Sequence, residues 1–563
     1  MKYNLLLVLL IFMVVLFMVL KDDTINQSML VPIDLRELIP DDHPCYFIQN
    51  VVDQIDCSHA NRKFRGNPGE AAYPREMLLR LVLMSVFDGG LSSREIERRT
   101  KTDISYMYLA GMQRPNFRTI SRFKADNPDL IDEAFKTTIK IAKEEDLIKI
   151  HHVSLDGTKI KAKTSMNKLT SKEQIKIMKQ HLEESNELDE IEDEELGDES
   201  GNSVPESLTQ AKKFEKTIEK INNSSKDDRN KDKFRASSKN LLKQAEKSPE
   251  HKEKIYKKLE TLEEKIIESK KDVISINDPD ARFMLNKKGK WEYDYNGQIA
   301  VDDYKGIILA SYITNNPTDY KELIPLINQV ESNLSTIYDE TPSNFQISAD
   351  NGYSTDENTA FLEEQGYDGY ISSRKFSRQS KKYNILEKPF QKDNFDFNSE
   401  IGTYFCPLGQ PLYRIREYEY KNKKRISYWT NECKNCPVIE YCAKNGYGRT
   451  ISDYGNPSKI RMQRKMERSE AQEIYKIRSK TAELPFANLK QNMKLHEFST
   501  TGLKQVNTEF KLYTIGHTLN SIHLPLGGRT APGKARSGRR FLGTHGATLW
   551  LWSCLPKPGA PGH

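Results

Sequence analysis

The chain has 563 residues and carries 86 lysines and arginines against 80 acidic residues, a formal net charge of +6. Domains run to about 100–200 residues, so this length exceeds what one hydrophobic core serves, and we expect two or three domains with insertions. Seven cysteines in so long a chain exclude a small disulfide-stapled secreted scaffold and favour a reducing compartment.

The N-terminus is an apolar extension, residues 1–28. Its run from Leu5 to Leu20 is sixteen residues long, slightly short of the roughly 17–25 that span a bilayer. Two interpretations stay open. The run is a membrane anchor or uncleaved signal segment, or it is upstream readthrough before a polar sequence that begins with its own methionine at Met29.

Residues 29–150 are predicted to form an all-α domain. An apolar stretch ends at Asp88-Gly-Gly, and Ser92 and Glu95 then form a capping box that starts a helix. Arg118 and Arg122 share one face of a later helix, which indicates a helix-turn-helix-like succession. That face would meet DNA phosphates or base edges; the alternative is a solvated charged face on a helical bundle.

The segment 165–271 is dense in charge and reads as an insertion. Twelve acids and no base lie between Glu183 and Glu206, a block typical of a solvated linker. Nearer its end, apolar residues recur at alternating spacings of four and three, which predicts a helix whose seam packs on a neighbour. The seam residues are Ile255, Leu259, Leu262 and Ile266.

Strand-like and helix-like segments alternate over residues 151–164, 272–400 and 452–523, which predicts an α/β domain. Asp156 and Asp350 each end an apolar or β-branched run and have glycine within two residues. We therefore expect both at the C-terminal ends of strands, where α/β folds place their sites. Glu483 is a third acid, on a helix predicted from Tyr475 to Lys490, and three carboxylates suffice for two metal ions.

Residues 401–451 form a cysteine-rich segment with the spacing C-x26-C-x2-C-x5-C. Four thiolates at such spacing predict a closed structural zinc site, and the alternative is that some are buried or free thiols. The cysteines are Cys406, Cys433, Cys436 and Cys442.

The C-terminal segment, residues 524–563, differs in composition from the rest. From Pro525 onward it holds six lysines and arginines and no Asp, Glu, Asn, Ile or Tyr. Without these six charges the chain is neutral. The change indicates fused or frame-shifted coding sequence; the alternative is a disordered basic tail that adds nonspecific phosphate contacts.

Together, six stretches resemble the bacterial insertion-sequence transposases of the DDE class, in the branch with a tyrosine-arginine-glutamate-lysine helix. The resemblance covers roughly Met29 to Leu519. The stretches are Val31 to His43, Leu155-Asp156-Gly-Thr, Asp278 to Arg282, Tyr295-Asn-Gly-Gln298, Ala349 to Tyr353, and Tyr475-x2-Arg478-x4-Glu483-x6-Lys490.

The resemblance implies an α/β RNase H-like catalytic domain interrupted by helical and cysteine-rich insertions, and an N-terminal DNA-binding domain. By motif match, Asp156, Asp350 and Glu483 would be ligands of two Mg²⁺ ions, with Mn²⁺ as an alternative, and a similar cysteine cluster supports structural Zn²⁺. Tyr475, Arg478 and Lys490 would contact the DNA backbone. Glu470 and Glu473 are rival acids; Glu483 is preferred because it alone precedes Leu-Pro-Phe and stands seven residues before Lys490.

The partners expected on this basis are the terminal inverted repeats of the element and target DNA, with a homodimer to pair the two ends. The expected location is the cytoplasm, at the nucleoid, with membrane association as an alternative if the apolar run is part of the protein. Two rivals remain: a decayed, non-catalytic protein that still binds element ends, and a membrane-anchored nuclease.

Overall fold

The computed structural model describes residues 34–62, 72–165, 167–196, 210–224, 231–286, 289–340, 342, 344–372, 390, 392–398, 401–420, 423–443, 447–453 and 458–523. Within these ranges no helix is both long and apolar enough to cross a membrane. The run from Leu5 to Leu20 and the tail from Pro525 lie outside the described residues.

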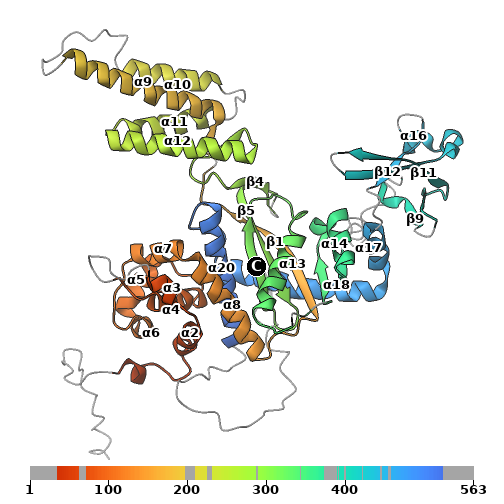
Figure 1. Cartoon of the computed structure of the whole chain (residues 1–563), viewed down its shortest axis with the longest axis horizontal. Helices are drawn as coiled ribbons and strands as arrows, with labels where there is room; N and C mark the ends of the chain where they lie inside the picture. The colour runs from red at the N-terminus through yellow and green to blue at the C-terminus, as the bar shows by residue number, and fades with distance from the viewer. Residues whose placement is uncertain are drawn as a thin grey trace, which may run out of the picture.

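Helices alone build the N-terminal part (Figure 1). The predicted apolar stretch forms α4, which is almost wholly buried. Ser92 caps α5 as predicted, since its hydroxyl accepts a hydrogen bond from the backbone N–H of Glu95 at 3.2 Å. The side chain of Glu95 binds Arg98 and Arg99 instead of completing the capping box. The elements are η1 (Leu35–Leu38), α2 (Pro44–Val52), α3 (Ser58–Arg62), α4 (Arg75–Phe87), α5 (Ser93–Thr102), α6 (Ile104–Leu109), α7 (Phe117–Asp126) and α8 (Pro128–Glu144).

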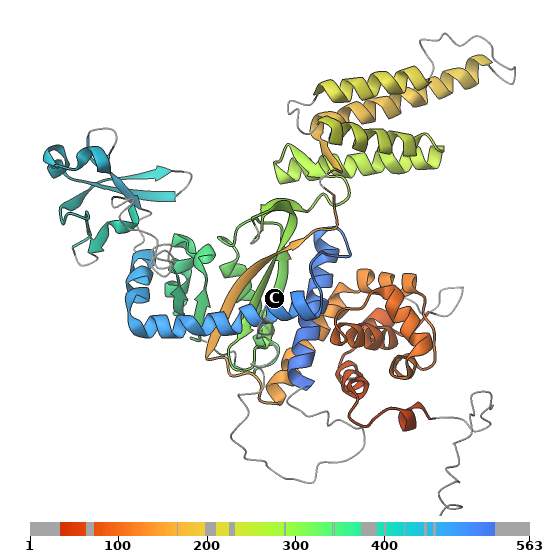
Figure 2. The same ribbon diagram turned by 180° about the vertical axis from the view of Figure 1, so that it is seen from behind.

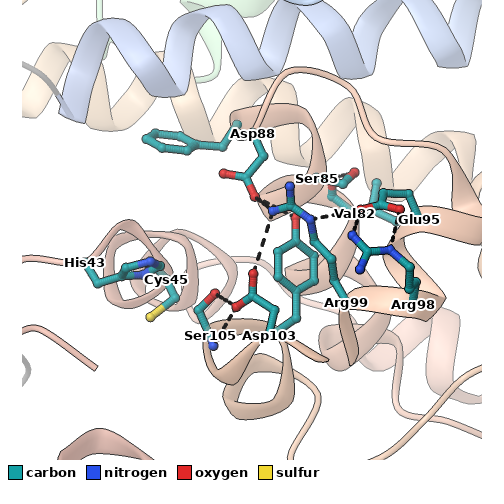
Figure 3. A network of polar contacts seen from close by, with 12 residues as sticks. His43, Cys45, Val82, Ser85, Asp88, Glu95, Arg98, Arg99, Asp103 and Ser105 are labelled. Atoms are coloured by element: carbon teal, nitrogen blue, oxygen red, sulfur yellow. Dashed lines mark hydrogen bonds and ion pairs between the residues drawn. The ribbon is translucent and has the colours of Figure 1, made fainter. Parts of the chain in front are cut away.

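A polar network around Arg99 joins α4, α5 and α6 (Figure 3). Its guanidinium lies 2.7 Å from Asp88, just beyond α4, and 5.3 Å over the ring of Tyr106 in α6. The Tyr106 hydroxyl donates to the same carboxylate at 2.9 Å. Burial raises the pKa of Asp88 even though Tyr106 and Arg99 oppose that shift. The network therefore holds a partly buried carboxylate with two matched donors.

A mixed sheet forms the centre of the molecule (Figure 1). β5 pairs antiparallel with β1 on one side and with β4 and β6 on the other, while β1, β7 and β8 are parallel. The predicted combination of helices and sheet is confirmed. The strands are β1 (His152–Lys161), β4 (Arg282–Leu285), β5 (Trp291–Asp302), β6 (Ile308–Thr314), β7 (Gln346–Ala349) and β8 (Asp368–Ile371).

Helices cover both faces of this sheet. On one face, α20 (Leu503–His523) bonds β6 through Thr514 and Ser311 at 2.9 Å. On the other, Tyr312 of β6 donates to Glu322, which precedes α13 (Leu323–Ser335). Towards β8 lie α14 (Asp356–Glu364), α17 (Ser458–Glu467) and α18 (Ser469–Thr481). Figure 2 shows α18 and α20 crossing in front of the sheet.

Four long helices stand away from the sheet in both views and have a hydrophobic core of their own. The short strands β2 (Leu169–Ser171) and β3 (Val273–Ser275) pair where the chain leaves and re-enters the body. All four predicted seam residues of α12 are buried in this core, so the predicted packing is confirmed. The helices are α9 (Lys172–Leu196), α10 (Gln210–Ser224), α11 (Lys231–Ala245) and α12 (Pro249–Ser269).

A separate five-stranded antiparallel sheet lies next to the four clustered cysteines. Its small core contains the rings of Phe397, Tyr404 and Tyr428. The strands are β9 (Asp396–Asn398), β10 (Thr403–Phe405), β11 (Pro411–Tyr420), β12 (Lys423–Trp429) and β13 (Ile451–Asp453), with η5 (Asn431–Asn435) and α16 (Ile439–Cys442) beside them.

The Arg99 network yields a stability prediction. Replacing Arg99 with Met leaves Asp88 partly buried without its cation, so we expect a loss of about 1–3 kcal/mol in the N-terminal helices. The measurement is hydrogen–deuterium exchange of peptides from α4 to α6 in the full chain. The matched control is Arg98→Met, since Arg98 is 61% exposed and binds only the carboxylate of Glu95; it should cost under about 1 kcal/mol. Equal protection in both variants would contradict the prediction.

Candidate active site

Asp156 and Asp350 meet where strand β7 stops beside β1. Parallel pairing between the two strands ends at Leu155 and Ala349, and Asp350 follows directly. Asp350 is therefore at a strand end, as predicted. For Asp156 that prediction is wrong, because antiparallel pairing with β5 carries β1 on to Lys161. One side of β1 thus has no strand partner from Asp156 until Lys161, where the backbone bridges Glu497, and the two carboxylates lie at the start of this opening.

Arg478 of α18 lies between the two aspartates. Its Nη2 is 2.9 Å from Asp156 Oδ1 and 4.0 Å from Asp350 Oδ2, and its Nε donates to the carbonyl of Leu155 at 3.4 Å. Asp156 is only 2% exposed and Arg478 8%. Burial lowers the pKa of Arg478, but the charge of Asp156 outweighs it with help from Tyr475 and Asp350, so the pKa is raised overall. The ion pair with Arg478 offsets the free-energy cost of burying the Asp156 carboxylate.

Three contacts hold the chain from α18 onward against one face of β1. Ser154, Asp156 and Thr158 alternate along the strand, so their side chains share that face. Thr481 bonds Ser154 at 2.7 Å, and the Lys490 ammonium donates to the Thr158 hydroxyl at 2.6 Å. With Arg478 on Asp156, these contacts place the segment that contains Glu483 over the strand that carries Asp156.

Glu483 starts a new helix. α18 ends at Thr481, Ala482 is buried, and α19 (Glu483–Ala487) begins with the exposed Glu483. The helix predicted from Tyr475 to Lys490 is therefore interrupted, and Pro485 lies in the first turn of α19, where proline is tolerated. The following turn, η6 (Asn488–Asn492), is a π-helix that carries Lys490. The two anchors on either side of Glu483 are therefore separated by an irregular segment.

Across the described ranges, no group of three or more His, Cys, Asp or Glu side chains is gathered closely enough to hold a metal ion. Asp156 and Asp350 face the guanidinium of Arg478, and Glu483 is exposed. The rival acids lie earlier in α18, where Glu470 is exposed and Glu473 binds Lys476 at 2.5 Å. The assignment of ligands therefore stays a prediction.

Tyr475 and Lys490, predicted to contact DNA, are at this site too. Burial raises the pKa of Tyr475, and its ring lies 6.0 Å from the guanidinium of Arg478. Lys490 also donates to the carbonyl of Lys159 at 3.1 Å. All the residues of the predicted helix motif except Glu483 are thus engaged with β1 or with one another.

Asp319 is a further carboxylate at the site that the sequence did not reveal. Its Oδ1 accepts hydrogen bonds from Asn296 at 2.6 Å and from Gln298 at 2.8 Å. Tyr353, the last residue of the short helical turn that Asp350 caps, donates to Gln298. Asn296 and Gln298 belong to a motif already noted, whereas no pattern marked Asp319.

Two glycines leave room for Asp319. A Cβ on Gly157 would lie 2.8 Å from Asp319 Oδ1, and one on Gly352 would lie 3.0 Å from its Oδ2 and 2.9 Å from Asp350 Oδ1. Gln298 pairs with Gly157 across β1 and β5, so Asp319 packs on the face of β1 opposite to the Asp156 side chain. Asp319 therefore packs against the segments that carry Asp156 and Asp350, on that opposite face of β1.

The predicted face of α7 is exposed. Arg118 and Arg122 point to solvent, while Ile120 and Phe123 are buried. The guanidinium of Arg118 lies 5.8 Å from the ring of Phe117. Arg94 of α5 lies 5.0 Å from the same ring, so α5 and α7 share one basic surface.

The four clustered cysteines line one cavity in the small sheet. Burial raises the pKa of the Cys442 thiol, as do the other three cysteines, while Arg449 opposes the shift. Their thiols fit zinc in kind. Their geometry is not that of a metal-holding group, so the structure gives the zinc prediction no support beyond their common location.

Two family models match the chain. A model described as a transposase DDE domain matches residues 405–523, which include Glu483 but neither aspartate. A second, described as a transposase domain, matches residues 33–126, the N-terminal helices. No curated protein and no solved structure matches.

A transposase DDE domain implies an RNase H-like fold, and the central mixed sheet is consistent with it. The family also implies an enzyme of the nuclease and transposase kind that acts on DNA and generally uses a divalent metal. The two matches, one at each end of the described chain, support an insertion-sequence transposase of the DDE class.

Proposed function

We propose that this transposase cleaves DNA at the ends of its insertion element and transfers them to target DNA, with Asp156, Asp350 and Glu483 as the acidic residues. The observation that carries the proposal is the convergence of two aspartates with the segment from Arg478 to Lys490 at the open side of β1. We assign the catalytic domain to residues 151–164, 272–400 and 452–523.

The donor set suits magnesium, because all three side chains offer carboxylate oxygens, and Mn²⁺ is an alternative. Bound ions would supply a water of lowered pKa and stabilise the leaving oxygen of the phosphodiester. Asp156 and Asp350 are already adjacent, whereas Glu483 would have to turn inward from its exposed position.

Arg478 would act through a change of partner. It neutralises Asp156 in this structure, and a DNA phosphate brought to the same place offers it an oxyanion that arginine binds well. Lys490, held on Thr158 and Lys159, would add a second cation for the backbone. Tyr475 would orient Arg478 by packing its ring against the guanidinium.

We propose that the basic surface of α5 and α7 recognises the terminal inverted repeats. Arg118 and Arg122 project from α7, and no acid lies between them. Their position suits phosphate contacts or entry into the major groove. A homodimer would bring two ends together, and binding to chromosomal DNA would place the protein at the nucleoid.

The second candidate is a non-catalytic protein that binds element ends. It is favoured by two observations: the described residues do not gather the three acids into a metal site, and the DDE match does not reach the two aspartates. The two candidates differ in whether DNA is cut.

Removal of single acids tests the catalytic assignment. Asp156→Asn and Glu483→Gln each delete a charge that the ions need, so we expect cleavage to fall by about 10³-fold or more with DNA binding retained. The measurement is cutting of a labelled duplex carrying the element's own end, with Mg²⁺. Glu473→Gln, which changes an exposed rival acid, should cut at the wild-type rate. Binding without cutting by the wild type would favour the non-catalytic candidate.

Asp319 is proposed to position the two aspartates without contacting the reacting atoms. Asp319→Ala leaves the amides of Asn296 and Gln298 without their acceptor, so we expect roughly a tenfold or greater loss of kcat with unchanged DNA affinity. Asp319→Asn keeps one acceptor oxygen and should recover part of the rate. Glu364→Gln, on an exposed helix end, is the control. Wild-type kcat in Asp319→Ala would contradict the role.

A further inference from the structure

The β11–β12 hairpin has both of its acidic residues on one face of the sheet. Its register pairs Tyr418 with Arg425 and Arg416 with Ser427, and these pairs alternate with Glu417 opposite Ile426. Directly opposed residues of two antiparallel strands share a face, and neighbours in sequence point to opposite faces. Arg416 and Arg425 therefore share one face with tyrosines and no acid, whereas the face of Glu417 and Glu419 also carries basic residues: Arg414 pairs with Glu417, and Lys424 is opposite Glu419. We name the first the Arg–Tyr face, made of Arg416, Tyr418, Tyr420 and Arg425; Glu417 and Glu419 lie on the reverse.

A β-bulge marks where this hairpin leaves the core. The register shifts between Arg414 and Arg416, so that Ile415 is the extra residue. Before the shift, Leu412 and Tyr428 are buried in the small core. After it, Arg416 and Tyr420 are exposed. A bulge redirects the side chains of a strand, and here it turns the basic residues outward.

The guanidinium groups on the Arg–Tyr face lie over aromatic rings. Arg416 lies 4.7 Å from the ring of Tyr418, and Arg425 lies 4.8 Å from that of Tyr420. Hydrogen bonds from Ser452, then Ser427 and Arg425, lower the pKa of Tyr418. Stacking on a ring restricts the rotamers of an arginine, so less side-chain entropy is lost when it binds an anion.

We propose that the Arg–Tyr face binds the phosphate backbone of duplex DNA, as a second contact separate from the basic surface of α5 and α7. The inference rests on the proposed function only in taking DNA as the partner. Its grounds are charge complementarity and stacked arginines: the Arg–Tyr face holds Arg416 and Arg425 and no acid, whereas the acids on the reverse face lie with the basic residues Arg414 and Lys424. Arginine is well suited to phosphate oxygens.

The face belongs to a different part of the molecule from α7. Figures 1 and 2 show the small sheet and the N-terminal helices on different sides of the central sheet. A duplex that contacted both places would be held at two points along its length. The candidate active site of the central sheet would lie between these two points.

The test compares two double variants of the full chain. Arg416→Gln with Arg425→Gln removes two cations from the Arg–Tyr face, and Glu417→Gln with Glu419→Gln changes two charges on the reverse. Binding to an element-end duplex and to an unrelated duplex is measured over a salt series. Each phosphate contact contributes about 0.9 to the slope of log K against log salt. The arginine variant should lower the slope by roughly 1.8 on both duplexes, and the acid variant should leave it unchanged or bind slightly tighter.

Arg416→Lys with Arg425→Lys keeps both charges and should restore most of the slope, which a merely misfolded hairpin would not show. An unchanged slope in the Gln variant overturns the inference, and if the wild type still cuts DNA the proposed function stands. A wild type that neither binds nor cuts overturns both. Loss of self-association in the Gln variant, with an unchanged slope, would assign the face to an acidic protein surface and likewise overturn the DNA contact.

Discussion

The candidate site depends on an unequal pairing of strand β1. One side of β1 is paired with β5 along its whole length, whereas β7 stops beside Leu155. From Asp156 in the middle of β1 that side lacks a strand partner, and the chain leaving β7 places Asp350 next to Asp156. Two carboxylates so close repel each other, and the buried guanidinium of Arg478 offsets that repulsion. The same residue ties α18 to the sheet, so electrostatics and packing act through one side chain.

Helix α20 connects the central sheet to the N-terminal helices. Gly516 crosses α4 so closely that a Cβ there would lie 2.7 Å from the carbonyl of Val86. Lys511, almost buried, pairs with Asp132 of α8. At its start, the backbone N–H of Leu503 donates to Asp280 at 3.0 Å, from the motif before β4. A helix held by backbone contact at one end and by a carboxylate at the other limits how far the two parts can shift.

The helical unit between β1 and β4 and the small sheet between β8 and α17 have their own cores, which explains how the central sheet accommodates them. The four long helices bury their apolar seams against one another, and the small sheet packs its aromatic rings together. The core of the small sheet is separate from the central one, and the helical unit adds Phe234 of α11 to the central core, so each unit is stabilised mainly by its own contacts. Their surfaces are then free to carry other contacts, as proposed for the Arg–Tyr face.

Local patterns in the sequence predicted several of the helices and named the acids of the candidate site. Apolar spacing predicted α4 and the seam of α12, and Ser92 marked a helix start, because these depend on neighbours within one or two turns. Only the folded structure shows that Asp156 lies inside a strand and that Arg478 forms an ion pair with it. It also shows Asp319 on the opposite face of that strand. These arrangements arise from strand pairing and side-chain contacts between residues far apart in the sequence, such as Asp156 with Ile299 and with Arg478, which no local pattern encodes.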